Sequence, residues 1–257
     1  MSAYDADLSA MLDPCILARR VGMEPDVWQA RALRSAAPQS LWNCSRQSGK
    51  STTAAIIALT TALYRPASTT LLISTGQIQA AEVLKKVTSL YRQLGRPIPS
   101  VAENAQSLLL ENSARIVSLP GEERTIRGYA ADLIVCDESA RIPDEMYAAI
   151  RPMLAVTGGR FLGISTPAGK RGWWYDAWEH GGPEWERVQV TAEQCPRIKP
   201  AWLDRERQTL GDYTFRQEYG CEFVEDSEAV FGSDYVDAMF TSTATPLWAP
   251  EPVEVAV

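Results

Sequence analysis

The stretch Leu41–Ser51, Leu-Trp-Asn-Cys-Ser-Arg-Gln-Ser-Gly-Lys-Ser, predicts a phosphate-binding loop. Two apolar residues open it and an apolar helical run, residues 52–59, follows it, which is the strand, loop and helix setting that Gly-Lys-Ser requires. Backbone N–H groups of such a loop point inward at a phosphate, and the N-terminal end of the helix adds positive potential. Lys50 is expected to contact the β- and γ-phosphates, and the Ser51 hydroxyl to ligate Mg²⁺. The alternative is a surface loop that carries Gly-Lys-Ser by chance.

A second motif, residues 131–138, reads Ala-Asp-Leu-Ile-Val-Cys-Asp-Glu and is an apolar strand that ends in two acids. Asp137 is expected to hold Mg²⁺, directly or through water. Glu138, one residue past the strand end, is expected to polarise the attacking water as the catalytic base. A strand followed by Asp-Glu is common by itself. Its place about 87 residues after Lys50, with strands and helices between them, makes the pair of motifs specific for nucleotide hydrolysis.

The composition sets outer limits on the protein. A chain of 257 residues suffices for one large α/β domain with a small appendage, and no apolar run approaches the ~20 residues of a membrane span. The N-terminal residues lack the basic charge of a secretory signal. Five cysteines form no C-x-x-C pair and predict reduced thiols of a cytosolic protein, and the single His180 cannot make a His-rich metal site. A net charge of −7 argues against a protein coated in nucleic acid, but allows a local basic track.

The segment before the loop predicts a helix that begins near Pro25 and carries Trp28 and Gln29. A Gln amide donates and accepts at once, as reading an adenine edge requires. The alternative is an ordinary amphipathic helix that packs Trp28 into the core. Further upstream, residues 6–20 are apolar at helical spacing, with a break at Pro14.

A basic stripe is predicted on the helix over residues 76–94, where Lys85, Arg92 and Arg96 fall on one side. It is a candidate track for a DNA backbone. The alternative is a solvated face near a helix C-terminus, where cations are favoured anyway. Lys170 and Arg171 are the next candidates.

The remaining segments complete an α/β pattern. Residues 69–74 and 160–165 predict buried strands, and the second ends in Ser165-Thr166-Pro167. Hydroxyls at the carboxyl end of a central strand face the ligand crevice of an open sheet, so Ser165 and Thr166 either sense the γ-phosphate or form a plain strand-ending turn. The further expected elements are a hairpin at 107–111 and 115–119, a helix from about 139 to 154, an aromatic helix at 173–178 favoured as core, a strand at 184–190, helices at 200–209 and 212–219, and a strand at 221–224.

Six segments together resemble the ATPase domain of tailed-bacteriophage large terminases, over about Glu24 to Phe231. They are Trp-Gln at 28–29, Ser-Arg-Gln-Ser-Gly-Lys-Ser at 45–51, Thr-Ile-Arg-Gly at 125–128, Leu-Ile-Val-Cys-Asp-Glu-Ser-Ala at 133–140, Ile-Ser-Thr-Pro-Ala-Gly-Lys-Arg-Gly at 164–172 and Phe-Arg-Gln-Glu-Tyr-Gly-Cys-Glu-Phe at 215–223. The first glycine of the usual loop pattern is replaced here by Cys44, and terminases are similar in tolerating a non-glycine there.

The resemblance implies a P-loop NTPase of the additional-strand, catalytic-glutamate type, with a central, mostly parallel sheet flanked by helices and a small C-terminal lid subdomain. It implies that Gln29 reads adenine, that Arg46 faces the phosphates within its own subunit, and that Ser165 and Thr166 form the coupling motif. Arg127 matches the finger inserted into a neighbouring subunit, with Arg124 and Arg141 as the other candidates. The expected ATP contacts are Trp28, Gln29, Ser45, Arg46, Gln47, Ser48, Gly49, Lys50, Ser51 and Thr52.

The resemblance also implies a DNA-packaging motor in the host cytoplasm. Its cofactors would be ATP and Mg²⁺, and its partners double-stranded DNA, the portal protein and a small terminase subunit, with a pentameric ring docked on the portal and no membrane. The expected domains are an ATPase core at 1–170, a lid at 171–235 and a linker or loose tail at 236–257, without a nuclease. The alternatives are a helicase-like ATPase, a nucleotide-gated capsid assembly factor and a small-molecule kinase.

Overall fold

The computed structural model describes residues 3–120 and 128–225, and its helices and strands all belong to one unit that ends at Val224. Helices alternate with strands along most of the chain, as an α/β fold requires. The helices are α1 Ala3–Leu12, α2 Pro14–Arg20, α3 Val27–Arg34, α4 Lys50–Tyr64, α5 Gln77–Gln93, α7 Asp144–Ile150, α8 Gly172–Glu179 and α9 Pro200–Glu218, with short 3-10 turns η1 Ser139–Arg141, η2 Arg151–Leu154 and η3 Ala192–Gln194.

One sheet of eight strands holds the described residues together, in the order β3-β4-β5-β2-β6-β7-β1-β8. Its strands are β1 Gln39–Cys44, β2 Thr69–Ser74, β3 Ser100–Glu103, β4 Ser107–Leu110, β5 Arg115–Pro120, β6 Leu133–Asp137, β7 Arg160–Ser165 and β8 Glu186–Val190. Only the pairings of β4 with β3 and with β5 are antiparallel, so the sheet is mostly parallel, as predicted.

The position of β7 decides the class of the sheet. It pairs in parallel with β1 on one side and with β6 on the other, so it lies between the strand before the phosphate loop and the strand that ends in Asp137-Glu138. β7 is therefore the additional strand of the predicted fold, and that prediction is confirmed. Because the strands are parallel, their carboxyl ends at Cys44, Asp137 and Ser165 lie at the same edge of the sheet.

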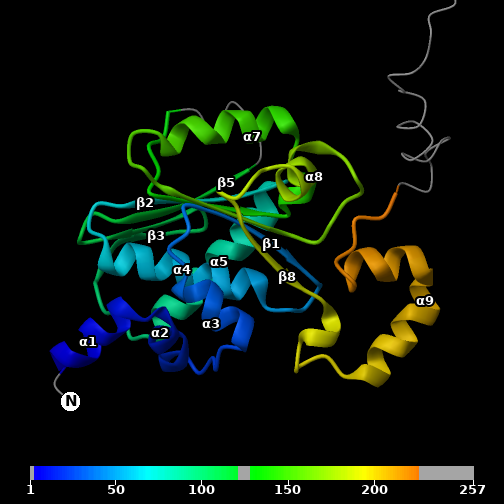
Figure 1. Cartoon of the computed structure of the whole chain (residues 1–257). Coiled ribbons are helices and arrows are strands. Elements are labelled where there is room, and N and C mark those ends of the chain that lie inside the picture. The colour runs from blue at the N-terminus through cyan, green and yellow to red at the C-terminus, as the bar shows by residue number, and fades with distance from the viewer. Residues whose placement is uncertain (1–2, 121–127, 226–257) are drawn as a thin grey trace, which may run out of the picture. The chain divides into compact units, whose positions relative to one another are not determined.

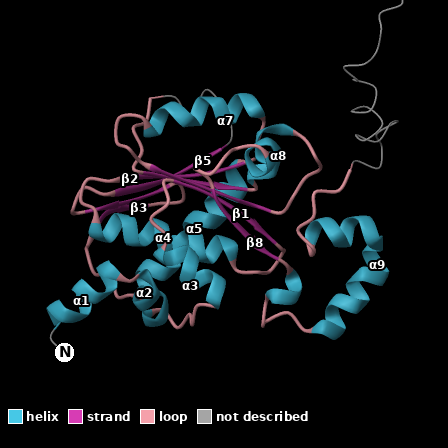
Figure 2. Cartoon of the chain, in the orientation of Figure 1, coloured by secondary structure: helices cyan, strands magenta, loops and turns pink. Residues whose placement is uncertain are grey.

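Helices cover both faces of this sheet, with α7 and α8 on one face and α2 to α5 on the other (Figures 1 and 2). Trp42, Leu72 and Leu162 pack with α2, α3, α4 and α5 in one core cluster. Leu41, Leu71 and Phe161 pack with η1, α7 and α8 in a second cluster on the other face. Side chains of successive strand residues point to opposite faces, so this pattern gives a three-layer arrangement with the sheet in the middle.

Several expected elements are confirmed and some are corrected. The break at Pro14, the hairpin and the buried aromatic helix are present, with Trp173 and Trp174 in the core. The strand expected at 221–224 is wrong, since Cys221 has a positive φ of 57° and this segment forms no ladder. The helix expected from residue 139 begins only after Pro143. The two helices expected at 200–209 and 212–219 are confirmed: they make up α9 and are separated at Gly211, whose φ and ψ are non-helical.

Part of the segment expected as a lid belongs to the sheet. β8 pairs with β1 from Ser40 to Cys44, and α8 packs in the core. Of the elements described within the expected lid segment, η3 and α9 are therefore the ones left outside the sheet and its core clusters. The expected tail at 236–257 lies outside them. In the described ranges, no helix is both long enough and apolar enough to cross a membrane.

Candidate active site

The predicted phosphate loop joins the end of β1 to the start of α4. Gly49 adopts a left-handed conformation, with φ of 91°, directly before the helix. The Ser48 hydroxyl donates to the Ser45 carbonyl at 2.8 Å, and both serines are fully buried, so they shape the loop from inside. The Lys50 ammonium donates to the same carbonyl at 3.4 Å. The loop is therefore folded with its lysine turned inward, as a phosphate site needs.

Cys44 occupies the position of the first loop glycine without strain. It is the last residue of β1, pairs in register with Val190 of β8 and is fully buried in the core. A residue in an extended strand needs no positive φ, so a small apolar side chain fits there as well as glycine would. The cysteine that replaces the usual glycine therefore serves as a buried core side chain.

Gln29 and Arg197 hold the loop from the outside. The positive φ of Gly49 favours glycine, and a Cβ placed there would lie 2.7 Å from the Gln29 amide nitrogen, so that side chain would have to shift. The Gln29 carbonyl oxygen accepts the Asp26 N–H at 2.9 Å and caps α3. Arg197 donates to the Ser48 carbonyl at 2.8 Å and pairs with Asp26. The amide predicted to read adenine thus lies against the loop.

Trp28, which precedes Gln29 on α3, packs against the core. Its ring packs edge-on against Trp42, with centroids 5.9 Å apart, and it contacts the core cluster. A cavity of about 720 Å³ opens beside the loop, and neither Trp28 nor Gln29 is among its lining residues. Its walls include Gln47, Gly49, Lys50, Ser51 and Thr52 from the loop and α4, Arg197 and Lys199 from the segment before α9, and Trp202 and Arg205 from α9 itself.

Ser51 and Asp137 bring together two oxygen donors of the kind that bind magnesium. The Ser51 hydroxyl donates to the Asp137 carboxylate at 3.1 Å, although the residues come from α4 and β6. Burial raises the pKa of Asp137 above its ordinary value, and the charge of Glu138 raises it further, so a cation here would stabilise the ionised carboxylate. The donor set fits Mg²⁺, with phosphate oxygens and water completing the coordination. Among the residues that the structure describes, there is no cluster of three or more His, Cys, Asp or Glu that could hold a metal.

Glu138 has a strained backbone. Its φ of 57° and ψ of 36° are left-handed, which is rare for a residue with a side chain and costs on the order of 1–3 kcal/mol. Its N–H donates to the Asp137 carboxylate at 3.0 Å. Its own carboxylate accepts from Arg141 at 2.9 Å and is 38% exposed. The turn therefore points the carboxylate away from the strand and leaves it open to a water molecule.

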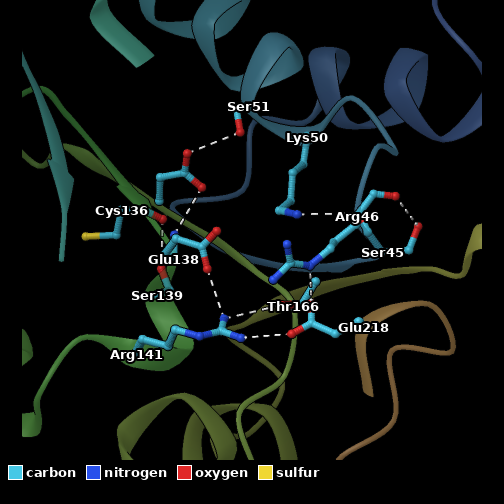
Figure 3. A network of polar contacts seen from close by, with 11 residues as sticks. Ser45, Arg46, Lys50, Ser51, Cys136, Glu138, Ser139, Arg141, Thr166 and Glu218 are labelled. Carbon is cyan, nitrogen blue, oxygen red and sulfur yellow. Dashed lines mark hydrogen bonds and ion pairs between the residues drawn. The ribbon is translucent and has the colours of Figure 1, made fainter. Parts of the chain in front are cut away.

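A network of charged side chains extends from Glu138 to the phosphate loop (Figure 3). Arg141 donates to Glu138, to the Thr166 hydroxyl at 3.3 Å and to Glu218 at 3.1 Å. Glu218 also accepts from Arg46 at 2.7 Å. One network thus joins the loop, the ends of β6 and β7, and the end of α9.

Of the predicted coupling pair, Thr166 belongs to this network and Ser165 does not. Ser165 is fully buried in register with Asn43, and its hydroxyl has no hydrogen-bond partner in the structure. Of the predicted fingers, Arg124 and Arg127 lie outside the described residues. Arg141 is bonded to three residues of its own chain.

The predicted basic stripe is shorter than expected. α5 ends at Gln93, and Gly95 and Arg96 both have positive φ values, so Arg96 lies beyond the helix. A 3.1 Å hydrogen bond from the Arg96 N–H to the Tyr91 carbonyl closes the helix end. Arg92 and Arg96 both pair with Glu103, and Lys85 pairs with Glu82. Each of the three basic residues is thus paired with an acid of its own chain.

Comparison with known proteins identifies the family. The model of terminase large subunits, T4likevirus-type, N-terminal part, matches residues 41–234. This chain belongs to the large-terminase family. The terminase large subunits of Thermus phage G20c and Thermus virus P23-45 are each 29% identical to it over 248 residues, covering 82% of this chain and 51% of theirs. The chain therefore spans about half the length of these terminases.

Solved terminase structures share the fold. The large terminase ATPase domain of Thermus phage P74-26 is 26% identical, with a TM-score of 0.72, and covers 80% of this chain and 97% of that one. The large terminase of another thermophilic bacteriophage, solved in complex with ADP, is 11% identical with a TM-score of 0.61, and covers 81% of this chain and 52% of that one. The predicted P-loop NTPase fold is thereby confirmed.

Sequence reasoning assigned no role to Glu218 and Arg197, which both contact the phosphate loop of this terminase chain. Glu218 stands inside one of the six segments that carry the resemblance. The sequence therefore singled out this segment, but it did not indicate which residues Glu218 would contact. Arg197 stands in no motif. Their partners lie 172 and 149 positions away along the chain, beyond the reach of any local pattern.

Proposed function

We propose that this chain hydrolyses ATP and that hydrolysis drives double-stranded viral DNA into a procapsid. The observation that carries the proposal is the 3.1 Å contact of Ser51 with Asp137 beside an inward-turned Lys50, with Glu138 next along the chain. It brings a phosphate loop, a magnesium ligand pair and a base candidate to one edge of the sheet. Membership of the terminase family supports the packaging role.

Each residue would contribute a separate part of the hydrolysis. The loop N–H groups and Lys50 bind the β- and γ-phosphates, and Arg46 adds charge from within the loop. A magnesium ion held by Ser51 and Asp137 would neutralise phosphate charge. Glu138 orients a water molecule and accepts its proton as the water oxygen bonds to the γ-phosphorus and the bond to ADP breaks. The products are ADP and inorganic phosphate.

The proposed partners follow from the family. They are double-stranded DNA, the portal protein and a small terminase subunit, with the motor working as a ring on the portal in the host cytoplasm. A ring places an edge of each nucleotide site beside a neighbouring subunit. Arg127 is the proposed residue that reaches across that seam.

The proposed function is tested by steady-state phosphate release from ATP with and without Mg²⁺ and duplex DNA. We expect turnover that requires Mg²⁺ and rises with protein concentration and with DNA. Lys50→Ala is the control and should weaken nucleotide binding itself, because the phosphate charge loses its partner. Nucleotide binding without turnover under all these conditions would instead favour a nucleotide-gated assembly factor.

The DNA contact is tested by changing Lys85, Arg92 and Arg96 together to Glu. Duplex binding by the assembled motor should weaken, and the slope of log affinity against log salt should flatten by roughly one released counterion per lost phosphate contact. The pairing with Glu82 and Glu103 means that DNA must displace these acids. Filter binding over a salt series measures both effects.

A matched control changes three exposed arginines on another surface, Arg19, Arg20 and Arg34, to Glu. It alters the net charge equally and should leave the salt slope close to the parental one. An unchanged slope in the first variant would exclude this surface and move the track to Lys170 and Arg171.

A further inference from the structure

β8 is an edge strand of the sheet. It pairs with β1 and stands last in the strand order, so no described strand lies on its other side. The Val190 carbonyl points to β1, because it accepts the Ser45 N–H at 2.9 Å. Backbone groups of successive strand residues point to opposite sides of the strand, so the N–H and C=O groups of Arg187 and Gln189 point to the free edge. Backbone groups on a free edge can pair with a strand from another chain.

α3 lies beside β8 (Figure 1), and a groove of about 560 Å³ lies between them. Val27 and Trp28 line it from α3, and Val188 and Val190 from β8. Val27 is 91% exposed, whereas the other three are packed in the core or against it. None of the lining residues lines the cavity beside the phosphate loop, so the groove is separate from the proposed nucleotide site.

The groove carries positive charge. Arg31 follows Val27 by about one helical turn, and its side chain makes no hydrogen bond or ion pair with any residue that the structure describes. Arg187 donates to backbone carbonyls and forms no ion pair with a carboxylate in the described ranges. Asp26 also lines the groove, but it pairs with Arg197 at 2.7 Å. Two arginines without a carboxylate partner favour an acidic ligand, although the whole chain has a net charge of −7.

An extended acidic peptide matches the edge, the apolar groove and the charge. Its backbone would pair with Arg187 and Gln189 by strand addition. Its side chains alternate between the two faces of the sheet, so apolar residues at every second position would cover Val27 on the α3 side. Arg187 points to the other face, since it is in register with Leu41, and would meet acids at the positions between. An acid at the end of the peptide would reach Arg31.

We propose that the free edge of β8 and its groove bind an extended, acidic segment of a partner protein as an added strand. The recognised chemistry is a row of backbone amides with alternating apolar and acidic side chains. Duplex DNA and a second copy of this chain are the other occupants, which the test separates. The inference goes beyond the proposed ATPase and does not depend on it.

The probe is the peptide Glu-Val-Glu-Val-Glu-Val-Glu, capped at both ends and labelled with a fluorophore, and its binding to the full chain is measured by fluorescence anisotropy. Arg31→Glu should weaken binding on the order of 10-fold, because it places a like charge beside an acid. Val27→Asp should weaken it by a similar factor, and an acid in the first turn of α3 is compatible with the helix. The two variants test charge and groove independently, so either one suffices if the other does not fold.

Two matched controls change exposed residues outside the groove. Arg207→Glu makes the same charge change on α9, and Val156→Asp makes the same apolar-to-acid change at a residue that is 87% exposed. Both should keep the parental peptide affinity, and an equal loss in them would overturn the proposal by reducing the effect to net charge. ATP turnover should stay parental in the groove variants. Its absence in the parent would count against the proposed function alone.

Two N-methylated peptides test the strand pairing itself. One carries methyl groups on the valine nitrogens and the other on the glutamate nitrogens, so each loses the backbone donors of one edge of the peptide. Because an added strand pairs through one edge, one isomer should bind about 10-fold more weakly or worse, and the other within about twofold of the unmodified peptide. Equal weakening of both isomers, or no binding of the unmodified peptide, would overturn the proposal.

The other occupants are identified by filter binding of duplex DNA and by sedimentation of the parent. Neither DNA affinity nor the sedimentation of the parent should depend on the groove. DNA binding that Arg31→Glu weakens more than Arg207→Glu does would make the groove a nucleic-acid contact. Dimers of the parent that Val27→Asp dissociates would make it a contact between copies of this chain. Either result would overturn the proposal.

Discussion

Glu138→Gln is expected to lower ATP turnover by about 10²–10⁴-fold, the range for a lost general base, while nucleotide affinity is retained. The substitution keeps the length of the side chain, and the amide oxygen can still accept the Arg141 hydrogen bond that the carboxylate accepts at 2.9 Å. What it removes is the charge that orients water and takes its proton. The loop with Lys50, which is the proposed phosphate site, and Ser51, the proposed magnesium ligand, are untouched.

Turnover and binding must be measured on the same preparation. Phosphate release gives the rate, and calorimetry with ATP at a temperature where turnover is negligible gives the affinity. Glu145→Gln, an exposed acid on α7, is the control and should keep the parental rate. Hydrolysis by Glu138→Gln at the parental rate would exclude this residue as the base.

Arg127→Ala is expected to lower hydrolysis by the assembled ring by about 10³–10⁵-fold, the range for a lost arginine finger. The affinity of a single chain for nucleotide should stay nearly intact, because a finger from outside acts on the transition state of a neighbouring site. Arg141 is bonded to Glu138, Thr166 and Glu218 of its own chain, so it is the less suitable candidate for this role.

Mixing the two inactive variants tests the trans role directly. In a mixed ring, an Arg127→Ala subunit has a good base and borrows the arginine of its Glu138→Gln neighbour, so some activity should return. A matched mixture of Arg127→Ala with Lys50→Ala tests the same complementation without the base variant. Rings that form at every mixing ratio without any return of activity would count against a trans role for Arg127.

The parts of the fold that the sequence predicted are those with local signals. The phosphate loop, the strand before Asp137 and the breaks at Pro14 and Gly211 each show in a few consecutive residues. β3 was missed because it is a four-residue edge strand whose Val101 is 64% exposed, so it lacks the apolar run of a buried strand. The wrong strand at 221–224 had such a run, but Cys221 turns the backbone there.

The candidate site was predicted where a motif names the residue, and missed where a distant residue completes it. Ser51 and Asp137 meet as their motifs predict. Nothing near Glu218 in the chain indicates that it will share its carboxylate between Arg46 and Arg141, because both partners reach it only through the order of the strands. The basic stripe shows the reverse error, since helical spacing was extended to Arg96, past the end of α5 at Gln93.

The hydrogen bond from the Arg46 N–H to the Glu218 carbonyl has a consequence for biosynthesis. The loop that begins at residue 45 leaves the ribosome early, yet its backbone partner is translated 172 residues later. β1 likewise obtains its neighbours only once β7, at Arg160–Ser165, and β8, at Glu186–Val190, have been translated. Contacts between such distant segments form slowly, and an unpaired buried N–H is costly. We therefore expect the nucleotide site to mature after most of the chain has emerged, so that a nascent chain stalled before Glu218 is not yet competent to bind ATP.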